Sequence, residues 1–204
     1  MNMAQEDPSP VNPRAEAQRE RILNAAQKCF IESGFHAASM ANIAETAGMS
    51  AGLMYRYFEN KNAIVLAIIE RQLRDAHESL SRQNPASDLA ADLFALFRGW
   101  QARDPSVMNA ALYLEMSAEG TRDPQVATAI GQADAQLHED LKAWIARPRE
   151  QGGLGLPADR AAARAVMLQS FVRGLAVNAV RTPGLDPALV RRAIEDFVRA
   201  LLAA

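Results

Sequence analysis

Apolar positions recur along most of the chain at the spacing of an α-helix. The clearest stripe lies within residues 13–33, where one helix face would collect Ile22, Ala25, Ala26, Cys29 and Phe30. Alternating, strand-like runs are absent, and Pro and Gly fall between the periodic segments. The pattern therefore predicts an all-α chain of about nine helices. We expect them at residues 13–33, 39–47, 50–57, 60–82, 88–102, 105–119, 124–146, 158–181 and 187–203.

Local capping signals mark several of these helix ends. Three Asp-Pro pairs, at 104–105, 123–124 and 186–187, each predict a helix start. The Asp side chain accepts from free N–H groups of the first turn, and Pro at the next position gives up an N–H that would be unpaired there. Gly34 is predicted to end the first helix as a left-handed cap.

Residues 39–57 have the pattern of a helix-turn-helix. Ser39 can cap one short helix and Ser50 a second, and Gly48 between them supplies the positive φ that a tight turn needs. Two short helices joined by a three- or four-residue turn containing Gly form the unit that many DNA-binding proteins use. The sequence therefore predicts a helix-turn-helix, with the second helix as the element that would enter a groove of DNA.

The outer face of that second helix carries the chemistry. Small side chains at Ala51 and Gly52 would allow close approach to the floor of a groove, Tyr55 can donate its O–H to a phosphate, and Arg56 can make a bidentate contact to guanine. Lys61 follows in the first turn of the next helix, where a cation opposes the helix dipole unless an anion is bound there. We interpret Lys61 as a phosphate contact; the alternative is a solvated lysine.

Residues 14–69 resemble the DNA-binding domain of the TetR family of transcriptional regulators. The resemblance rests on an ordered set of matching positions: Gly34-Phe35, Ser39, Ile43-Ala44, Ala47-Gly48, Ser50, Gly52, Tyr55, Tyr57-Phe58 and Lys61. It implies an all-α homodimer that binds palindromic operator DNA and is released by a small-molecule effector, usually as a repressor. It also implies that Ser39, Tyr55, Tyr57 and Lys61 meet the DNA backbone while Ala51, Leu53 and Arg56 face bases. With the first residues of the second helix included, the nine predicted DNA-binding residues are Ser39, Ser50, Ala51, Gly52, Leu53, Tyr55, Arg56, Tyr57 and Lys61. Ala51 departs from the longer polar side chain that is common at its position.

The resemblance implies a division of the chain into four parts. These are an N-terminal tail predicted to be disordered (1–12), the helix-turn-helix domain (13–60), a connecting helix (61–82) and a regulatory domain for ligand binding and dimerisation (83–204). Residues 158–181 and 187–203 are apolar on more than one face, as helices with two partners are. The resemblance implies that they pair with their copies in a dimer, through Leu168, Val172, Leu175, Ala179, Leu189, Ala193, Phe197 and Leu201. The alternative is a larger monomeric core.

Aromatic and Met side chains in the regulatory part suit an adaptable apolar pocket, although a plain helical core contains the same residue types. The candidate effector contacts are Trp100, Met108, Leu112, Tyr113, Glu115, Met116, Glu119, His138, Met167 and Phe171. Glu115 and Glu119 share a helix face and would suit a cationic ligand, or else are solvated or paired. Residues 114–116, 122–124 and 173–175 also faintly resemble the branch that includes the choline-responsive regulator BetI. Arg173 replaces a common Asp there, so the effector is not carried over.

Composition and charge exclude several other functions. Lys and Arg number 22 against 24 Asp and Glu, so DNA binding must rest on local geometry rather than on a basic block. No apolar run is long enough to span a membrane, Cys29 is a lone cysteine, and the start lacks the features of a signal peptide, so we expect a cytoplasmic protein. No metal-ligand spacing, nucleophile elbow or phosphate-binding glycine loop is present. We predict no catalytic residue, metal or cofactor. The remaining alternatives are a helical protein-interaction module and, less favoured, an all-α enzyme.

Overall fold

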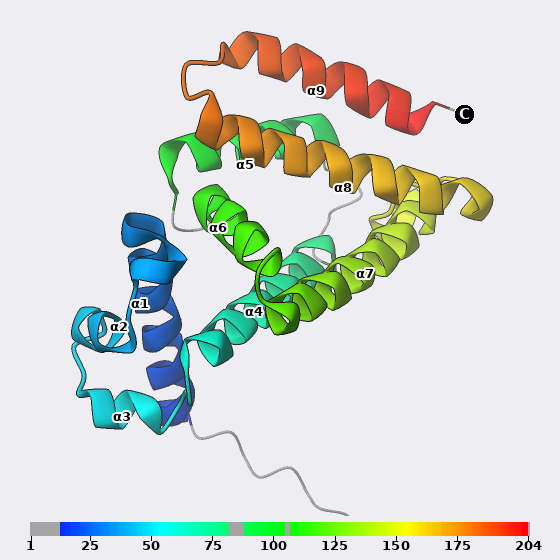
Figure 1. The fold of residues 1–204 in the computed structure, drawn as a ribbon. Coiled ribbons are helices and arrows are strands. Elements are labelled where there is room, and N and C mark those ends of the chain that lie inside the picture. The colour runs from blue at the N-terminus through cyan, green and yellow to red at the C-terminus, as the bar shows by residue number, and fades with distance from the viewer. Residues whose placement is uncertain (1–12, 82–87, 105–106, 204) are drawn as a thin grey trace, which may run out of the picture. The chain divides into compact units, whose positions relative to one another are not determined.

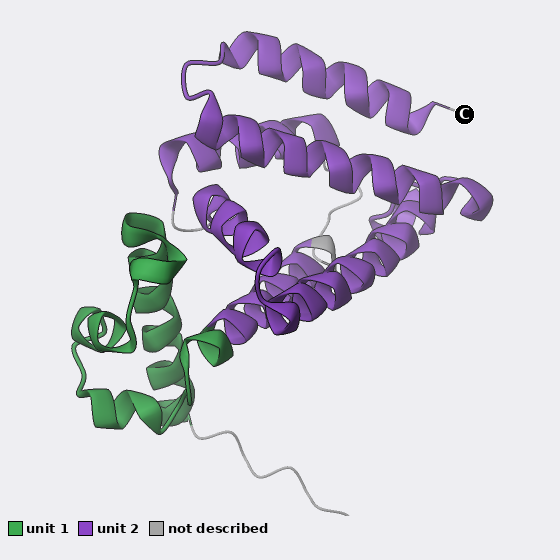
Figure 2. Cartoon of the chain, viewed as in Figure 1, with its two compact units in different colours: residues 1–64 green, residues 65–204 purple. Residues whose placement is uncertain are grey.

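The computed structural model describes residues 13–81, 88–104 and 107–203. In these residues the chain forms nine α-helices and one short 3-10 helix and contains no strand, so the predicted all-α class is confirmed (Figure 1). The chain divides into two compact units, residues 1–64 and 65–204 (Figure 2). That division falls inside one helix, whereas the sequence placed boundaries at 60/61 and 82/83. The predicted tail of residues 1–12 and residue 82 lie outside the described residues.

The first unit contains α1 (Pro13–Ala37), α2 (Met40–Thr46), α3 (Ala51–Tyr55) and the beginning of α4 (Lys61–Ser81). The predicted apolar stripe of α1 is the core face, and Ile22, Ala26 and Phe30 are almost completely buried. α1 packs against α2, and α2 packs against α3. Gly34 has φ 78° and ψ 161°, so the first helical run ends at this glycine as predicted, although its ψ is not that of a left-handed cap. A further short helical turn follows the kink, and in it Phe35 packs into the core against Phe30 at 5.2 Å between ring centroids.

The second unit contains the rest of α4 and five further helices, α5 (Leu89–Ala102), α6 (Ala110–Gly120), α7 (Pro124–Ala146), α8 (Ala158–Arg181) and α9 (Pro187–Leu202). The 3-10 helix (Arg149–Gln151) lies in the connection between α7 and α8. α8 contacts α5, α6 and α7, and α9 packs mainly against α5. The core between these helices is centred on Phe97, Trp100, Trp144 and Ile194.

Side-chain caps begin most of the helices in this unit, as their sequences require. Asp123 and Asp186 accept hydrogen bonds from the first-turn N–H groups of α7 and α9, and each is followed by Pro as predicted. The remaining Asp-Pro pair, at residues 104–105, does not mark the start of α6. α6 begins at Ala110, because Asn109 provides the cap and Trp100 Nε1 donates to the carbonyl of Met108 at 2.8 Å just before it. Pro105 itself lies outside the described residues.

Candidate nucleic-acid interface

The first short helix of the predicted pair, α2, is anchored at its start by a reciprocal cap. Ser39 Oγ accepts from the Asn42 N–H at 3.2 Å, and Asn42 Oδ1 accepts from the Ser39 N–H at 3.2 Å. Ser39 Oγ also donates to Asn42 Oδ1. This arrangement satisfies two otherwise open donors at the helix end. The Ser39 hydroxyl is exposed but committed to the cap, so a phosphate would compete with Asn42 for its proton.

The turn between α2 and α3 has the predicted backbone. Gly48 has φ 62°, a left-handed conformation that costs an L-residue roughly 1–2 kcal/mol. The N–H groups of Gly48 and Met49 donate to the carbonyls of Glu45 and Ala44, at 2.9 and 3.0 Å. A Cβ on Gly48 would also lie 2.7 Å from Arg21 Nη2, the far end of a flexible side chain, which would have to shift. The backbone conformation is therefore what favours Gly at this position.

The recognition segment, which we define as α3 together with residues 56–58, is held by buried side chains on one side. Ser50 Oγ accepts from the Leu53 N–H at 3.2 Å, and the backbone continues in helical turns to Phe58. Met54 is completely buried and Phe58 is 3% exposed. Burial of side chains of this size stabilises the segment by about 1.5–3 kcal/mol each. The sequence analysis missed Met54, although its i, i+4 spacing to Phe58 is the signal that could have identified it.

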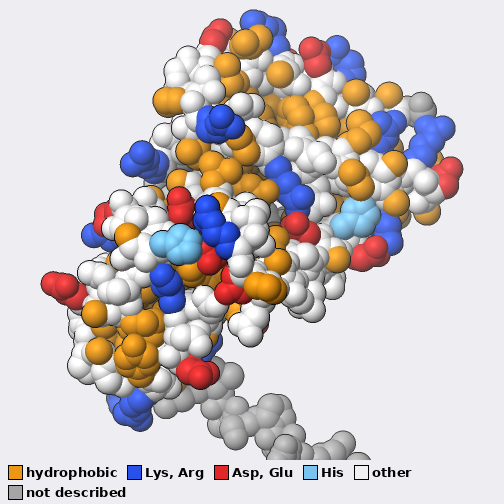
Figure 3. Space-filling model, viewed as in Figure 1, with side chains coloured by type: hydrophobic (Ala, Val, Ile, Leu, Met, Phe, Trp, Pro, Cys, Tyr) orange, Lys and Arg blue, Asp and Glu red, His pale blue; other side chains and the backbone are white. Residues whose placement is uncertain are grey.

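The opposite side of the recognition segment faces solvent. Ala51, Gly52, Tyr55 and Arg56 are exposed, with 54% of Tyr55 accessible, while Leu53 is half-buried. Figure 3 shows hydrophobic side chains gathered on the surface over this helix. Ser50 is also exposed and serves as the α3 cap. Seven of the nine predicted DNA-binding residues therefore lie within residues 50–57, namely Ser50, Ala51, Gly52, Leu53, Tyr55, Arg56 and Tyr57.

Lys61 and Tyr57, the other two residues predicted to contact the DNA backbone besides Ser39 and Tyr55, are half-buried. The ammonium group of Lys61 donates to the carbonyls of Phe35 at 2.6 Å and Ala38 at 3.0 Å and lies 4.2 Å from the Phe35 ring centroid. The cation that we interpreted as a phosphate contact thus binds carbonyls at the α1–α2 junction, which explains why it is tolerated at a helix start. Tyr57 is half-buried, and its carbonyl accepts from Arg19 Nη1 at 3.4 Å.

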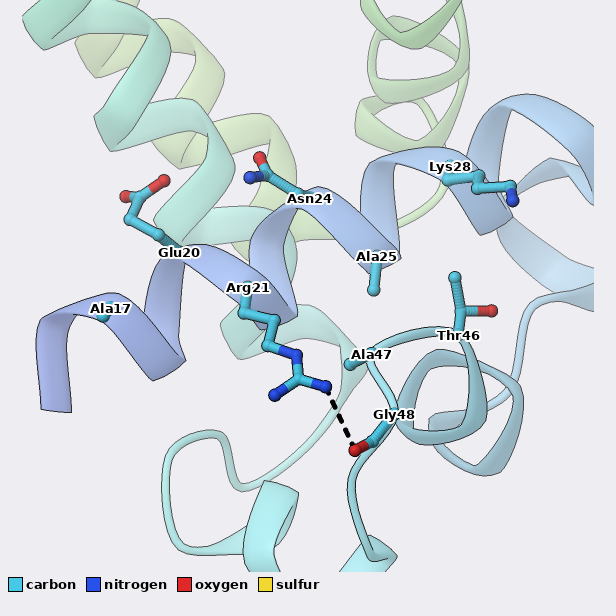
Figure 4. A pocket seen from close by; sticks show the side chains of 9 residues that line it. All are labelled: Ala17, Glu20, Arg21, Asn24, Ala25, Lys28, Thr46, Ala47 and Gly48. Carbon is cyan, nitrogen blue, oxygen red and sulfur yellow. Dashed lines mark hydrogen bonds between the residues drawn. The ribbon is translucent and has the colours of Figure 1, made fainter. Parts of the chain in front are cut away.

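Basic side chains of α1 also reach this region. Arg21 Nη2 donates to the carbonyl of Gly48 at 3.2 Å (Figure 4). Arg21 and Lys28 line a surface hollow of about 730 Å³ between α1 and the end of α2. The guanidinium carbon of Arg19 lies 4.5 Å from the Phe58 ring centroid. The sequence analysis missed Arg19 and Arg21, and no local pattern distinguishes them from other exposed arginines.

The ten predicted effector contacts differ in burial. Trp100, Leu112, Met116 and Glu119 are buried, Tyr113, Glu115, His138 and Phe171 are half-buried, and Met108 and Met167 are exposed. Phe171 stacks on Phe197 at 3.8 Å between centroids. A hollow of about 410 Å³ in the second unit is lined by a different set, namely Leu73, Arg74, His77, Glu78, Gln136 and Asp140.

The predicted dimer residues divide between two sides of α8 and α9. Leu168, Leu175, Ala179 and Leu201 are buried in the core of their own unit, and Val172 and Phe197 pack partly against it. Leu189 and Ala193 are exposed. On α8 the predicted stripe is the inner one, since a helix with two apolar sides does not reveal which one faces the core. On α9 the predicted stripe begins on the outward side, at Leu189 and Ala193, and only its last residue, Leu201, is buried. The outward residues that the prediction left out include Val166, 53% exposed, and Val180, 39% exposed.

Two further features bear on the function. Within the described residues, no group of three or more His, Cys, Asp and Glu side chains is arranged to hold a metal ion. None of the described helices combines the length and the apolar character needed to cross a membrane.

Comparison with known proteins gives matches over both parts of the chain. The profile "Bacterial regulatory proteins, tetR family" matches residues 22–68, and "BetI-type transcriptional repressor, C-terminal" matches residues 100–203. The regulator UidR of Escherichia coli K12 is 37% identical over 122 residues, which cover 58% of this chain and 61% of UidR. The chain thus matches less than two thirds of that relative's length.

Two other relatives are matched over more of their length. BetI of Cronobacter sakazakii is 32% identical over 143 residues, which cover 67% of this chain and 70% of BetI. Among solved structures, GusR of Salmonella enterica superposes with a TM-score of 0.69 at 28% identity, over 91% of this chain and 95% of GusR.

Proposed function

The chain belongs to the TetR family of bacterial transcriptional regulators, and on that premise we propose that it binds palindromic operator DNA as a homodimer and is released by a small molecule. Residues 1–64 contact the DNA, and residues 65–204 bind the effector and the second copy. Repression is the outcome that the matching profile "BetI-type transcriptional repressor, C-terminal" suggests by likeness. We place this action in the cytoplasm, where the operator is found.

The observation that carries the proposal is the two-sided recognition segment. Met54 and Phe58 hold its inner side in the core, and its outer side presents Tyr55 and Arg56 behind two small residues at the helix start. This geometry suits insertion of the N-terminal turn of α3 into the major groove, with Arg56 donating two hydrogen bonds to guanine and Tyr55 donating to a phosphate. Phosphate contacts position the protein, and base contacts specify the sequence.

Dimerisation is proposed through the outward side of α8 and α9. Val166, Met167, Val180 and Leu189 are large apolar side chains that remain exposed in the single chain. Exposed apolar groups gathered on neighbouring helices are typical of a protein-protein interface. A twofold-symmetric pair places two recognition segments on one duplex, with half-site centres separated by about 34–36 Å or a multiple of it.

The effector is proposed to act through α4. This helix begins in the first unit, where Lys61 binds the α1–α2 junction, and it continues through the second unit. A ligand that prefers one position of α4 therefore changes the spacing of the two recognition segments. The ligand must bind the released state more tightly than the DNA-bound state, because equal affinity shifts nothing. Tyr113, Glu115, His138 and Phe171, which are half-buried, are the predicted contacts that we retain for it.

Selection of bound sequences from random duplexes with the purified full-length protein tests the proposal. We expect an inverted repeat to be enriched and the complex to contain two copies of the chain. Failure of every duplex to be enriched would overturn DNA binding and favour a protein-interaction module. Enrichment of a single, non-repeated site bound by one chain would overturn the dimer.

A further inference from the structure

Two arginines of α1 contact opposite ends of the recognition segment. Arg21 donates to the carbonyl of Gly48 at 3.2 Å, in the turn that precedes α3 (Figure 4). Arg19 donates to the carbonyl of Tyr57 at 3.4 Å, just after α3. Residues two apart on a helix do not face each other. The two side chains therefore diverge from α1 and reach the two ends of the same short segment.

Each arginine has a second interaction at its end. Arg19 lies over the ring of Phe58, with 4.5 Å from the guanidinium carbon to the ring centroid, and Phe58 is 3% exposed. A guanidinium over an aromatic face is held by attraction to the ring as well as by hydrogen bonding. At the other end, Arg21 Nη2 occupies the space beside Gly48, 2.7 Å from the position of a Cβ. The absence of a side chain at Gly48 thus gives Arg21 access to the backbone.

The recognition segment needs such external support because α3 has only five residues. A helix this short is not stable by itself in water, so tertiary contacts set its orientation. Met54 and Phe58 fix its depth in the core, but apolar contacts are not directional. Hydrogen bonds from guanidinium groups to backbone carbonyls are directional, and one lies at each end, part-buried at Arg19 and exposed at Arg21.

We propose that Arg19 and Arg21 are positioning residues that set the angle at which the recognition segment meets the DNA, and that neither is a phosphate contact. The inference rests on the proposed DNA binding of residues 1–64. Arginines on the DNA-binding part of a protein usually contact phosphate, but here one Nη of each guanidinium donates to a backbone carbonyl of the same unit. Loss of either arginine therefore weakens sequence-specific binding more than general binding.

The central experiment compares Arg19→Gln and Arg21→Gln with Lys28→Gln in the full-length protein. Lys28 is an exposed cation on the same helix and lines the same hollow as Arg21, so its variant controls for the loss of one positive charge. Affinity is measured for the selected operator and for an unrelated duplex over a range of salt concentrations. We expect each arginine variant to lose roughly 5- to 20-fold on the operator, the effect of one or two net hydrogen bonds. Binding to the unrelated duplex should change less than about twofold, with an unchanged salt slope, and Lys28→Gln should change neither duplex's affinity by more than that.

Three outcomes of this comparison overturn the proposal, two of them in general and one for Arg19 alone. An equal loss on both duplexes, with a salt slope less steep by about 0.9, would make the arginine a phosphate contact. Unchanged operator affinity in both arginine variants would show that the segment is oriented without them. Arg19→Lys retains a cation beside Phe58 and should therefore keep most of the operator affinity that Arg19→Gln loses. If Arg19→Lys also loses that affinity and its melting temperature falls strongly, Arg19 only stabilises the fold.

A second measurement needs no DNA. Amide hydrogen exchange of residues 51–58 should be faster in Arg19→Gln and Arg21→Gln than in the parent and in Lys28→Gln, while exchange in α8 stays unchanged. Unaltered exchange in residues 51–58 contradicts the positioning role. Absence of any bound duplex for the parent protein contradicts the proposed function instead, so the two failures are distinguishable.

Gly48→Ala gives an independent check on Arg21. In the parent the new Cβ would displace Arg21, whereas in Arg21→Gln the long guanidinium is already gone. Gly48→Ala lowers operator affinity by some factor in the parent protein and by another factor in Arg21→Gln. The second factor should therefore be at least about twofold smaller than the first. Strictly additive losses would show that Arg21 and Gly48 act independently and would contradict the contact's role.

Discussion

Replacement of Lys61 by Met separates the two roles that this residue can have. The Met side chain keeps an apolar stem of similar length but removes the ammonium group. That group donates to the carbonyls of Phe35 and Ala38 at 2.6 and 3.0 Å and lies 4.2 Å from the Phe35 ring centroid. We expect Lys61→Met to destabilise the first unit, because the two carbonyls lose a charged donor at a half-buried site.

The magnitude follows from these contacts. A hydrogen bond to a charged group contributes roughly 1.5–3 kcal/mol, and partial exposure at Lys61 places each bond at or below the lower end of that range. The contact with the Phe35 ring adds about 0.5–1 kcal/mol. We therefore expect the free energy of unfolding of the first unit to fall by about 2–3 kcal/mol. In a unit of this size each kcal/mol corresponds to roughly 4–8 °C, so its melting temperature should fall by about 10 °C or more.

Thermal unfolding of the full-length protein by circular dichroism measures this effect. Both tryptophans, Trp100 and Trp144, lie in the second unit, so tryptophan fluorescence would miss a change confined to the first. Lys28→Met is the control, and as an exposed substitution it should change stability by no more than about 0.5 kcal/mol. An unchanged melting temperature in Lys61→Met, combined with an operator salt slope less steep by about 0.9, would refute the structural role and restore the phosphate contact.

Three other substitutions test separate parts of the proposed mechanism. Arg56→Ala should weaken operator binding by roughly 1–3 kcal/mol and relax the preference at one base pair of each half-site, as seen by repeating the selection; an equal loss on all DNA would contradict base contact. Ser50→Ala should lower the free energy of unfolding by about 1 kcal/mol, but Ser50→Gly by only a few tenths, and urea unfolding that finds the two equal would argue against the cap. Leu189→Glu should raise the dimer dissociation constant roughly 10- to 100-fold in sedimentation experiments, whereas Ala135→Glu, on the exposed side of α7, should not; equal behaviour would move the interface elsewhere.

Most of the helical architecture was predictable because its signals are local. The caps at Ser39, Ser50, Asp123 and Asp186 act on N–H groups within three residues of themselves, and the structure has all four. The predicted turn requires a positive φ at position 48, which Gly adopts readily, and the observed φ of 62° confirms it. The helix predicted at Pro105 starts later, at Ala110, because the cap and the tryptophan contact that define the start lie at residues 108–109.

The side chains exposed on the recognition segment could also be predicted from the sequence. The outer positions of a short helix follow from its capping residues and its period, so Tyr55 and Arg56 could be assigned to the exposed side. The inner side was less certain, because a five-residue helix offers too few turns to define a stripe. Met54 was missed for that reason, although it is one of the most completely buried side chains of the chain that the structure describes.

Long, flexible cations are the residues whose roles the sequence left undecided. Lys61 binds carbonyls 23 and 26 residues away, and Arg19 and Arg21 bind carbonyls 38 and 27 residues away. Such partners depend on how α1, α2 and α4 pack, and no pattern within one helix contains that information.

The orientation of α8 likewise depends on how the helices pack. Its amino acids alone determined that the helix is apolar beyond one stripe and therefore needs more than one neighbour. Only the packed structure decided that Leu168, Leu175 and Ala179 face the chain's own core while Val166 and Val180 face outward. Periodicity measures the angle between side chains on one helix, whereas burial depends on where the other helices lie.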